Sequence, residues 1–440
     1  MNPTSKMTIV NTAKVEQSQS FKTTATENFL VLVDQAIVSA TSFLTMVLIG
    51  RGVSKEELGI FAFGTTLVLM ITTVYESLIG LPYVSLVDKR GDRRLFTGSS
   101  LIALGTLSLA ASGSILISAA IGLFGYLASS ISLLLLAIGL TLPFILLRLF
   151  IRRICFSKIA VGSALGFDAS ISLFQICFLC LFFYTDLLGG TFGHLAIGLS
   201  CAFAVAYWLV RNKYEYVINL TEANRQIHEN WTFSKSVFTS QLLWILHINA
   251  VIWSITYFLG SDIAGEFTAS LFTILLANPF VLGLLNILTS RAVKSFDGGG
   301  FASLRNTVFS NMLLMVSGVV VLWLVLMFYG DSLVVLVFGK DFSGQQLTIS
   351  ILGISMIAET VCKAPEQGLN AIERPDIVST INLVRLVVTI LGLAILLPTY
   401  GIIGAASTLA IADAIAAIFM ISSFVVATSH PLPVRSEDLV

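Results

Sequence analysis

Residues 130–151 read SISLLLLAIGLTLPFILLRLFI, and stretches of this kind decide the class of fold. The stretch holds 22 residues, of which Arg148 alone is charged. As a helix rising about 1.5 Å per residue, it would be about 33 Å long. The hydrocarbon core of a bilayer is about 30 Å thick and is crossed by about 20 apolar residues. The stretch therefore predicts a transmembrane helix.

The same pattern recurs along the whole 440-residue chain, which is 56% hydrophobic and only 11% charged. Soluble domains carry about 25% charged residues. This composition excludes a soluble enzyme, a nucleic-acid-binding domain and a disordered chain. About twelve spans are predicted, at 28–50, 58–84, 99–123, 130–151, 159–184, 193–210, 236–259, 263–289, 308–329, 345–369, 377–397 and 402–426.

A polar segment divides these spans six and six, which predicts an all-α polytopic membrane protein with two six-helix lobes. The expected division is a leader at 1–27, an N-terminal lobe at 28–210, a linker at 211–235, a C-terminal lobe at 236–426 and a tail at 427–440. In each half the second helix runs into a short basic loop, LVDKRGDRR at 86–94 and SRAVKSFDGGG at 290–300. Six helices per half favour a parallel repeat of the kind found in two-lobed transporters.

The basic residues predict the orientation. If the amino terminus is cytoplasmic, twenty of the 25 lysines and arginines lie in cytoplasmic segments or at their helix ends. Arg90 and Arg225 are among these twenty, whereas Lys340 is one of three outside. Cytoplasmic loops are enriched in basic residues. Both termini are therefore expected in the cytoplasm, and the protein is expected in the inner (cytoplasmic) membrane as a multi-pass protein.

Motifs of enzymatic chemistry are missing from the sequence. There is no GxxxxGK[ST] motif, so we expect no ATP hydrolysis by this chain. Cys177 and Cys180 form a CxxC inside an apolar helix, without a second pair or a nearby histidine, which favours simple packing. The four histidines are scattered, although His247 could carry protons within a helix. We expect no catalytic residue, metal or cofactor.

Seven ionisable residues within the predicted spans are the candidates for function: Asp34, Glu76, Asp168, Glu359, Lys363, Arg385 and Asp413. Charge in hydrocarbon is costly, so such residues face a bundle interior or a wet cavity. The alternative to a functional role is a structural ion pair, which the i, i+4 spacing of Glu359 and Lys363 favours. Arg385 lies near the predicted midplane, and Asp413 at similar depth could neutralise it.

Two further arginines lie at the cytoplasmic end of the fourth predicted helix. Arg148 and Arg152 are four residues apart and share one helix face. A pyrophosphate that entered from the cytoplasmic leaflet would meet both. The alternative is ordinary contact with lipid phosphate. In the tenth helix, Pro365 is expected to bend the helix beside Lys363.

Six segments carry a resemblance to a known family: LIGRGVSKEELGIFAF at 48–63, LLRLFIRR at 146–153, NWTFSK at 230–235, LVFGKDF at 336–342, GLNAIERPDI at 368–377 and LLPTYGIIGAA at 396–406. In their order and spacing, the chain from 28 to 426 resembles the polysaccharide or O-antigen flippases of the multidrug/oligosaccharidyl-lipid/polysaccharide exporter superfamily. The resemblance implies two lobes around a central cavity that opens to one side at a time.

The implied cargo is an oligosaccharide on a polyprenyl pyrophosphate, flipped outward for the assembly of O-antigen lipopolysaccharide or exopolysaccharide. With that cargo, Arg385, Lys363, Arg148 and Arg152 are the expected substrate-binding residues. Asp34, Glu359 and Asp413 are the expected coupling or gating residues. The expected partners are this lipid-linked oligosaccharide, membrane lipids and a polysaccharide polymerase, with no role for nucleic acid.

Two alternatives stay open. The intramembrane set has five acids against Lys363 and Arg385, and acidic Asp34 in the first helix favours a cation-coupled drug antiporter of the same superfamily. A membrane polysaccharide polymerase or glycosyltransferase would need a sizeable outer loop for its acceptor. None of the predicted outer loops exceeds roughly fifteen residues by hydropathy.

Overall fold

The computed structural model describes residue 30 and residues 33–429, except 88–91, 127, 159–160, 213–215 and 373. The described chain is helical almost throughout and contains no strand. Its helices after the first, Val33–Gly52, are α2 (Lys55–Tyr75), α3 (Leu81–Leu86), α4 (Arg93–Ile121), α5 (Ser129–Ser157), α6 (Val161–Tyr184), α7 (Gly190–Arg211), α8 (Leu220–Phe258), α9 (Ser261–Leu275), α10 (Asn278–Phe338), α11 (Gln346–Ala371) and α12 (Pro375–Ser429).

Ten of the described helices are long and apolar enough to cross a membrane, and α9 with the start of α10 forms one bent span more. α12 has 55 residues, about 82 Å of helix, which is far longer than one crossing needs. At Gly401, φ is 57° and ψ is −133°, a backbone conformation that favours glycine, and the helix turns back there. α10 is divided in the same way at Gly300. Dividing α12 gives twelve crossings, in agreement with the predicted number.

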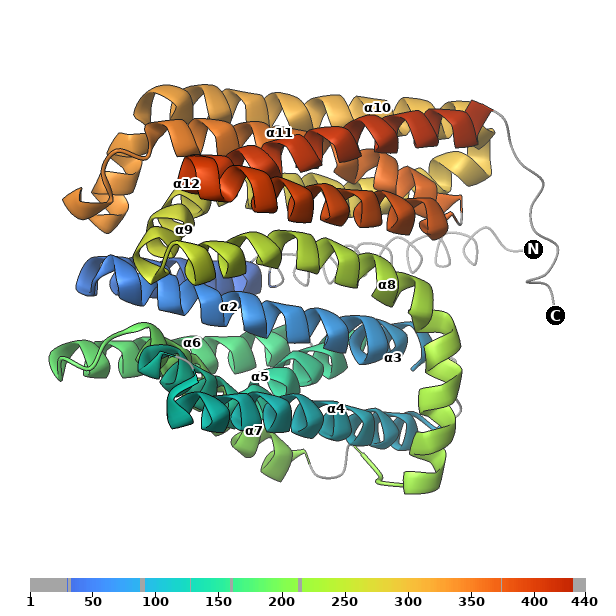
Figure 1. Cartoon of the computed structure of the whole chain (residues 1–440). Coiled ribbons are helices and arrows are strands. Elements are labelled where there is room, and N and C mark those ends of the chain that lie inside the picture. Colours follow the sequence, from blue (N-terminus) through green and yellow to red (C-terminus); the bar gives the residue numbers. More distant parts are fainter. Residues whose placement is uncertain are drawn as a thin grey trace, which may run out of the picture.

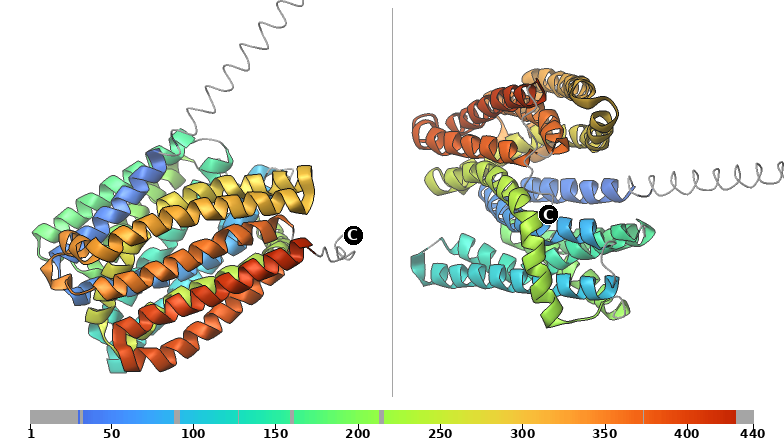
Figure 2. Two further views of the ribbon diagram at one scale, coloured as in Figure 1. Left: turned by 90° about the horizontal axis from the view of Figure 1, so that it is seen from above. Right: turned by 90° about the vertical axis from the view of Figure 1, so that its right-hand side faces the viewer.

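The helices form two lobes (Figure 1). The first helix and α2 to α7 make the N-terminal lobe, and α9 to α12 with the second half of α8 make the C-terminal lobe (Figure 2). We call the end at which α12 turns back the Gly401 end, at the left of Figure 1, and the end at which α12 finishes the Ser429 end, at the right. Within each lobe, neighbouring helices run between these two ends.

Local sequence sets the starts of several helices. Ser54 caps α2 by accepting a hydrogen bond from the Glu57 backbone, and Glu56 and Glu57 occupy the first turn, where acids suit the helix dipole. Asp92 caps α4 through the backbone N–H groups of Arg94 and Leu95.

α8 joins the lobes as one helix of 39 residues (Figure 2). Only its part at Phe238–Phe258 is apolar enough to span a membrane. The predicted linker at 211–235 is therefore helical from Leu220 onward. Just before it, the Val217 N–H donates to the Arg94 carbonyl at 3.1 Å, and Gly98 packs against the Val217 backbone. These contacts fix the start of α8 to the start of α4.

The two lobes meet closely at the Gly401 end, where α2 crosses α9. A Cβ atom at Gly59 would lie 1.8 Å from the Ser261 carbonyl oxygen, and one at Gly265 would lie 2.1 Å from that of Lys55. Beside this crossing, Lys55 Nζ lies 2.6 Å from Glu266 Oε1. Arg51 donates to the Val337 carbonyl at 2.8 Å, which caps the end of α10. Glycine at positions 59 and 265 allows the two backbones to approach this closely. We call this contact between α2 and α9 the glycine crossing.

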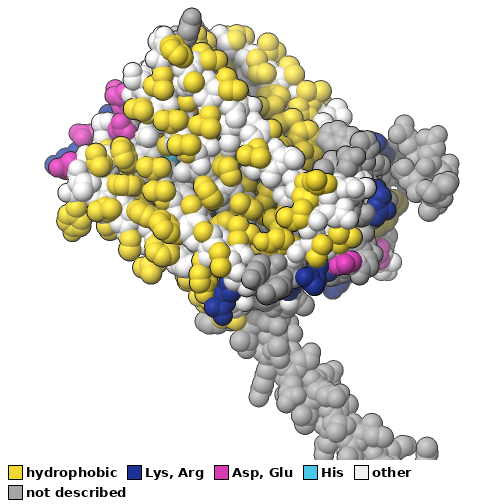
Figure 3. All heavy atoms as spheres, turned by 90° about the horizontal axis from the view of Figure 1, so that it is seen from below, with side chains coloured by type: hydrophobic (Ala, Val, Ile, Leu, Met, Phe, Trp, Pro, Cys, Tyr) yellow, Lys and Arg dark blue, Asp and Glu magenta, His cyan; other side chains and the backbone are white. Residues whose placement is uncertain are grey.

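The outer surface carries the signature of a lipid-facing protein. Leu109, Phe124, Tyr184 and Phe328 are examples of large apolar side chains that are mostly exposed. In Figure 3, hydrophobic side chains cover the middle of the face in view, and charged side chains lie toward its margins. Exposed apolar surface of this extent is stable against hydrocarbon but not against water.

The predicted orientation can be tested with single cysteines in a background without the five native ones. We expect a membrane-impermeant thiol reagent to label Lys340→Cys in intact cells and to label Arg225→Cys only after permeabilisation, because the basic loops stay inside. Both side chains are exposed, whereas Arg90 lies outside the described residues. Labelling of Arg225→Cys in intact cells would contradict the orientation.

Candidate functional site

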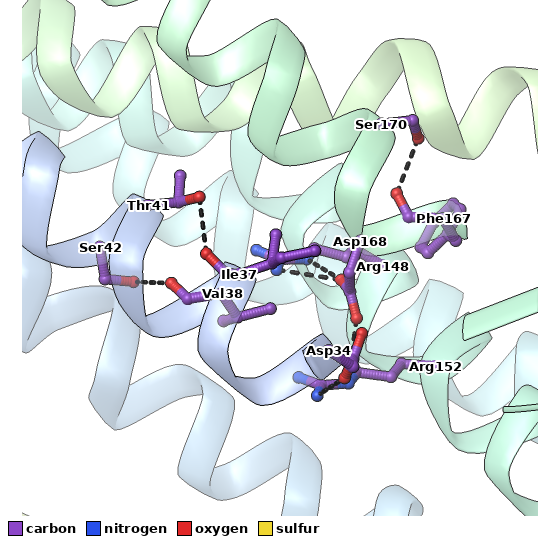
Figure 4. A network of polar contacts seen from close by, with 10 residues as sticks. All are labelled: Asp34, Ile37, Val38, Thr41, Ser42, Arg148, Arg152, Phe167, Asp168 and Ser170. Carbon is purple, nitrogen blue, oxygen red and sulfur yellow. Dashed lines mark hydrogen bonds and ion pairs between the residues drawn. The ribbon is translucent and has the colours of Figure 1, made fainter. Parts of the chain in front are cut away.

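Four charged residues from three helices form the N-lobe cluster: Asp34, Arg148, Arg152 and Asp168 (Figure 4). Arg148 Nη2 lies 3.1 Å from Asp168 Oδ1, and Arg152 Nε lies 3.1 Å from Asp168 Oδ2. Arg152 also donates through Nη2 to Asp34 Oδ2. Arg152 thus bridges two acids that come from different helices. The cluster contains two positive and two negative groups.

The acidic and basic members of the N-lobe cluster differ in how far they are exposed to solvent. The carboxylate side chains of Asp34 and Asp168 are both 0% exposed, whereas Arg148 is 16% and Arg152 22% exposed. The acids therefore lie behind the arginines. A guanidinium has five N–H donors, so each arginine can bind a buried acid and still offer donors to an incoming anion.

The local folding of α5 explains this arrangement. Arg148 and Arg152 share one face of α5, as their i, i+4 spacing predicted, and that face lies against Asp168 of α6. The sequence had placed Asp34 and Asp168 inside spans but did not indicate that they hold these two arginines. A second contact, Gln175 Nε2 to Thr45 Oγ1 at 2.8 Å, joins α6 to the first helix.

Glu76, another of the five intramembrane acids of the sequence analysis, is paired separately. It lies in a π-turn between α2 and α3, Glu76–Gly80, and accepts a hydrogen bond from Arg153 Nη2. Both side chains are about one third exposed, at 30% for Glu76 and 38% for Arg153. Arg153 directly follows Arg152 in the sequence, but it pairs with Glu76 and not with an acid of the N-lobe cluster.

The C-lobe cluster is centred on Asp413 of α12. Asp413 Oδ1 lies 3.4 Å from Arg385 Nε and 3.3 Å from His247 Nε2. Ser355 of α11 donates to Asp413 Oδ2 at 2.5 Å. One carboxylate therefore has three partners, from α8, α11 and the first half of α12. The pairing of Arg385 with Asp413, suggested by their similar depth in the sequence, is present in the structure.

The C-lobe cluster is closed off from solvent. Arg385, Asp413 and His247 are each 2% exposed. Arg385 Nη2 donates to the Cys362 sulfur at 3.0 Å, and His247 Nδ1 lies 2.7 Å from Thr389 Oγ1. In this conformation Arg385 therefore lies within the lobe, although the sequence analysis had it as a direct ligand of the cargo. The hydrogen-bonding roles of Ser355, Cys362 and Thr389 carried no signal in the sequence.

A more accessible pair lies nearby on α11. Lys363 Nζ is 2.9 Å from Glu359 Oε1, and the two side chains are 22% and 23% exposed. The i, i+4 spacing had favoured this pair. The ammonium of Lys363 also lies 4.8 Å from the centre of the Trp244 ring, a cation–π distance. Pro365, where the sequence predicts a bend, lies inside α11.

Polar contacts between the lobes lie farther along α8. The Asn249 side chain donates to the Thr66 carbonyl at 3.0 Å, and Trp253 Nε1 donates to Thr66 Oγ1 at 2.8 Å. Thr66 belongs to α2 of the N-terminal lobe. α8 is therefore bonded to both lobes. Among the described residues, no group of three or more His, Cys, Asp or Glu side chains is placed to hold a metal ion.

Comparison with known proteins places the fold. No protein-family model matches this chain, and no curated protein matches its sequence. Solved structures do match. The inward-facing conformation of a multidrug resistance MATE family transporter of the MOP superfamily aligns with a TM-score of 0.75 and 15% identity, over 90% of this chain and 98% of that one. The outward-facing conformation of a multidrug resistance MATE family transporter aligns with a TM-score of 0.66 and 14% identity, over 91% of this chain and 94% of that one.

A lipid II flippase, MurJ, in an inward closed conformation aligns with a TM-score of 0.72 and 13% identity, over 90% of this chain and 87% of that one. A MOP superfamily transporter from Pyrococcus furiosus aligns with a TM-score of 0.67 and 14% identity. These matches extend over nearly the whole chain at low identity. The protein therefore has the two-lobed, all-helical fold of the MOP superfamily transporters.

Proposed function

We propose that this protein is an alternating-access flippase for an oligosaccharide carried on a polyprenyl pyrophosphate, which it moves from the inner to the outer leaflet for surface polysaccharide assembly. The fold supports this proposal because structures described as transporters and as a lipid II flippase share it. A sugar head does not cross hydrocarbon unaided, since each desolvated hydroxyl loses its hydrogen bonds. A polar passage that opens to one side at a time removes that cost.

The observation that carries the proposal is the division by sign in the N-lobe cluster. Its acids are fully buried, and its two arginines are the accessible members. An anion that approaches this cluster meets N–H donors before it meets carboxylates. Guanidinium groups bind phosphate through paired hydrogen bonds. The cluster therefore suits a pyrophosphate better than a cation.

Within this function, the residues take different roles. Arg148, Arg152 and Lys363 are the proposed contacts of the pyrophosphate, because each is partly exposed. Arg385 is proposed to reach the cargo only in another conformation, since it is buried here against Asp413. In the empty state, these cations are paired with Asp34, Glu359 and Asp413. When the pyrophosphate binds, each cation would exchange its acid for the cargo, and this exchange would couple cargo binding to movement of the lobes.

The contact between the lobes at the Gly401 end supports a conformation closed on that side. If the Gly401 end is outside, as the basic residues predict, the described conformation would receive cargo from the cytoplasmic leaflet. Transport would then require the glycine crossing and the Lys55–Glu266 pair to separate. The lobes would pivot about contacts nearer the Ser429 end.

The direct test is reconstitution in liposomes with a fluorescent polyprenyl-pyrophosphate oligosaccharide, with outer-leaflet label quenched by a membrane-impermeant reagent. We expect the wild-type protein to flip the lipid. The double variant Asp34→Asn with Arg152→Gln should flip it at least tenfold more slowly, because it removes one guanidinium and keeps net charge unchanged. Thermal unfolding in detergent verifies that the variant is folded.

The control is Arg211→Gln, which removes an exposed arginine of the same lobe that bonds only to Tyr207 among the described residues. It should flip lipid at the wild-type rate. The proposal fails if the wild-type protein leaves the lipid-linked oligosaccharide in place, or if the folded double variant flips it as fast as the wild type.

One observation favours a second candidate, a cation-coupled drug antiporter. Asp34 is a fully buried carboxylate, and its Oδ1 has no hydrogen-bond partner among the described residues. Such a group could take up and release a proton. Efflux of a fluorescent dye by cells that express the protein, lost in Asp34→Asn, together with no flipping of the oligosaccharide lipid, would favour this candidate.

A further inference from the structure

The two arms of α10 border an open, shallow hollow outside the charge clusters. The arms meet at Gly300, and the hollow between them has a volume of about 690 Å³. Six of its lining residues are polar: Arg291, Ser295, Asn306, Thr307, Ser310 and Asn311. We call it the α10 hollow.

The two arms of α10 contact each other on the Ser429 side and on the Gly401 side of the hollow. Toward the Ser429 end, Ser295 Oγ lies 2.8 Å from Thr307 Oγ1, which ties one arm to the other. Toward the Gly401 end, the Phe280 ring packs so closely on Gly318 that a Cβ there would lie 2.3 Å from it. The arms are therefore in contact at both sides of the hollow.

The hollow opens on the lipid-facing side of α10. An exposed stripe runs along the second arm at spacings of three and four residues: Asn306, Ser310, Leu313, Ser317, Val321, Leu324 and Phe328. These spacings put all seven on one helix face. Leu313 is 69% and Phe328 74% exposed, so this face contacts hydrocarbon in a membrane. Asn306 and Ser310 continue the same face toward the Ser429 end.

The sequence places the hollow at headgroup depth. Asn311 is followed by 19 residues without charge, 312–330, which are long enough for the hydrocarbon core. The second arm, 301–338, is about 57 Å long, whereas a bilayer with its headgroups measures about 40–45 Å. The Gly300 hairpin therefore projects beyond the headgroups, and the polar lining lies at the boundary between headgroups and acyl chains.

The charge of the hairpin suits an anion. Residues 291–305 contain three basic residues and one acid. The Arg291 side chain is exposed and forms no ion pair with another described residue. The side chains of Asn306 and Ser310 likewise make no hydrogen bond to another described residue. Three groups able to donate hydrogen bonds thus line one hollow without a partner among the described side chains.

We propose that the α10 hollow binds the headgroup phosphate of an anionic phospholipid from the leaflet at the Ser429 end. The Arg291 guanidinium binds phosphate oxygens, and Asn306 and Ser310 donate hydrogen bonds to the remaining headgroup oxygens. Leu313, which also lines the hollow, contacts the acyl chain just below. The bound lipid is a resident of the hairpin and does not depend on which cargo the protein carries.

The test is native mass spectrometry of the full chain, titrated in detergent with phosphatidylglycerol. We expect Arg291→Gln to weaken the first phosphatidylglycerol binding event about tenfold, the size of effect that a charged hydrogen bond gives. Ser310→Leu, which fills the hollow, should weaken it similarly. Lys294→Gln is the matched control, since it removes a positive charge one turn along the same arm but outside the lining.

Three outcomes would overturn the proposal. Equal weakening by Lys294→Gln and Arg291→Gln would mean that only the general surface charge attracts the lipid. Unchanged binding in both Arg291→Gln and Ser310→Leu would place the lipid elsewhere. Competition by inorganic phosphate at the same concentration as phosphatidylglycerol would indicate a site for soluble phosphate. Circular dichroism of each variant verifies that the fold is retained.

Discussion

Replacement of Asp413 by alanine is expected to lower the free energy of unfolding by about 3–5 kcal/mol, because it leaves a buried positive charge without its partner. Asp413 holds Arg385 at 3.4 Å and also accepts contacts from His247 and Ser355. Arg385 is 2% exposed, so water cannot replace the lost carboxylate without opening the lobe. Thermal unfolding in detergent, followed by tryptophan fluorescence, measures the loss.

A surface ion pair provides the matched control. Asp376 lies 3.1 Å from Arg374, and these side chains are 65% and 35% exposed. Exposed pairs contribute about 0–1 kcal/mol, so Asp376→Ala should change stability very little. An equal loss in Asp413→Ala and Asp376→Ala would contradict the view that burial of the C-lobe cluster makes Asp413 essential.

The same cluster gives a test of mechanism. If Arg385 and Asp413 are only a structural pair, Arg385→Gln combined with Asp413→Asn should restore the transport that Arg385→Gln alone loses. If Arg385 binds the cargo in another conformation, the double variant should stay inactive although it is folded. Arg385→Lys should then retain part of the activity, because an ammonium keeps the charge but not the paired hydrogen bonds. Flipping in liposomes is the measurement.

Replacement of Gly59 by leucine is expected to open the Gly401 end. Its Cβ would lie 1.8 Å from the Ser261 carbonyl oxygen, and backbone cannot move aside as a flexible side chain can. Overpacking of this kind costs about 3 kcal/mol, which would change the ratio of closed to open molecules about a hundredfold. The pair Lys55–Glu266 beside the crossing should separate together with the helices.

Spin labels report this change directly. The side chains of Glu56 and Asp262 are exposed and flank the crossing on opposite lobes, so Glu56→Cys and Asp262→Cys can be labelled. The background lacks Cys177 and Cys180, the exposed native cysteines among those described. Electron–electron resonance should give a short distance in the parent protein and a longer one with Gly59→Leu.

Gly283→Leu is the control, because a Cβ at Gly283 would meet nothing within 4 Å. It adds the same side chain at another helical glycine without a clash, and the label distance should stay short. A short distance in the folded Gly59→Leu protein as well would show that the crossing does not hold the two lobes closed.

The sequence predicted the number of spans well and their ends less well. Hydropathy places α5 at 130–151, whereas the helix continues to Ser157. Arg152 and Arg153 lie in that extension, and acids from other helices satisfy their charge there. Likewise α8 begins at Leu220, within a segment too polar to register as a span. Apolar patterns locate the membrane-embedded part of a helix, whereas capping and tertiary contacts determine the residue at which the helix ends.

The candidate site was likewise predictable in part: the sequence indicated which residues belong to it, but not how they pair across helices. The cost of burying charge selected Asp34, Asp168, Arg385 and Asp413 from the sequence, and local spacing paired Glu359 with Lys363. Pairings between distant helices, such as Asp168 with Arg148 and Arg152, required the three-dimensional arrangement. Relative exposure, which separates the arginines of the N-lobe cluster from the acids behind them, is likewise a property of packing alone.

The continuity of α8 restricts how the length of this chain can vary. One extra residue inside a helix rotates all that follows by about 100° and shifts it by about 1.5 Å. Such an insertion in α8 would turn Asn249 and Trp253 away from Thr66, and His247 away from Asp413. Its polar first half looks like a tolerant loop, but even an insertion of seven residues, about two whole turns, would restore the rotation and still shift the helix by about 10 Å. Chimaeras that exchange lobes between proteins of this fold should therefore be joined ahead of Leu220.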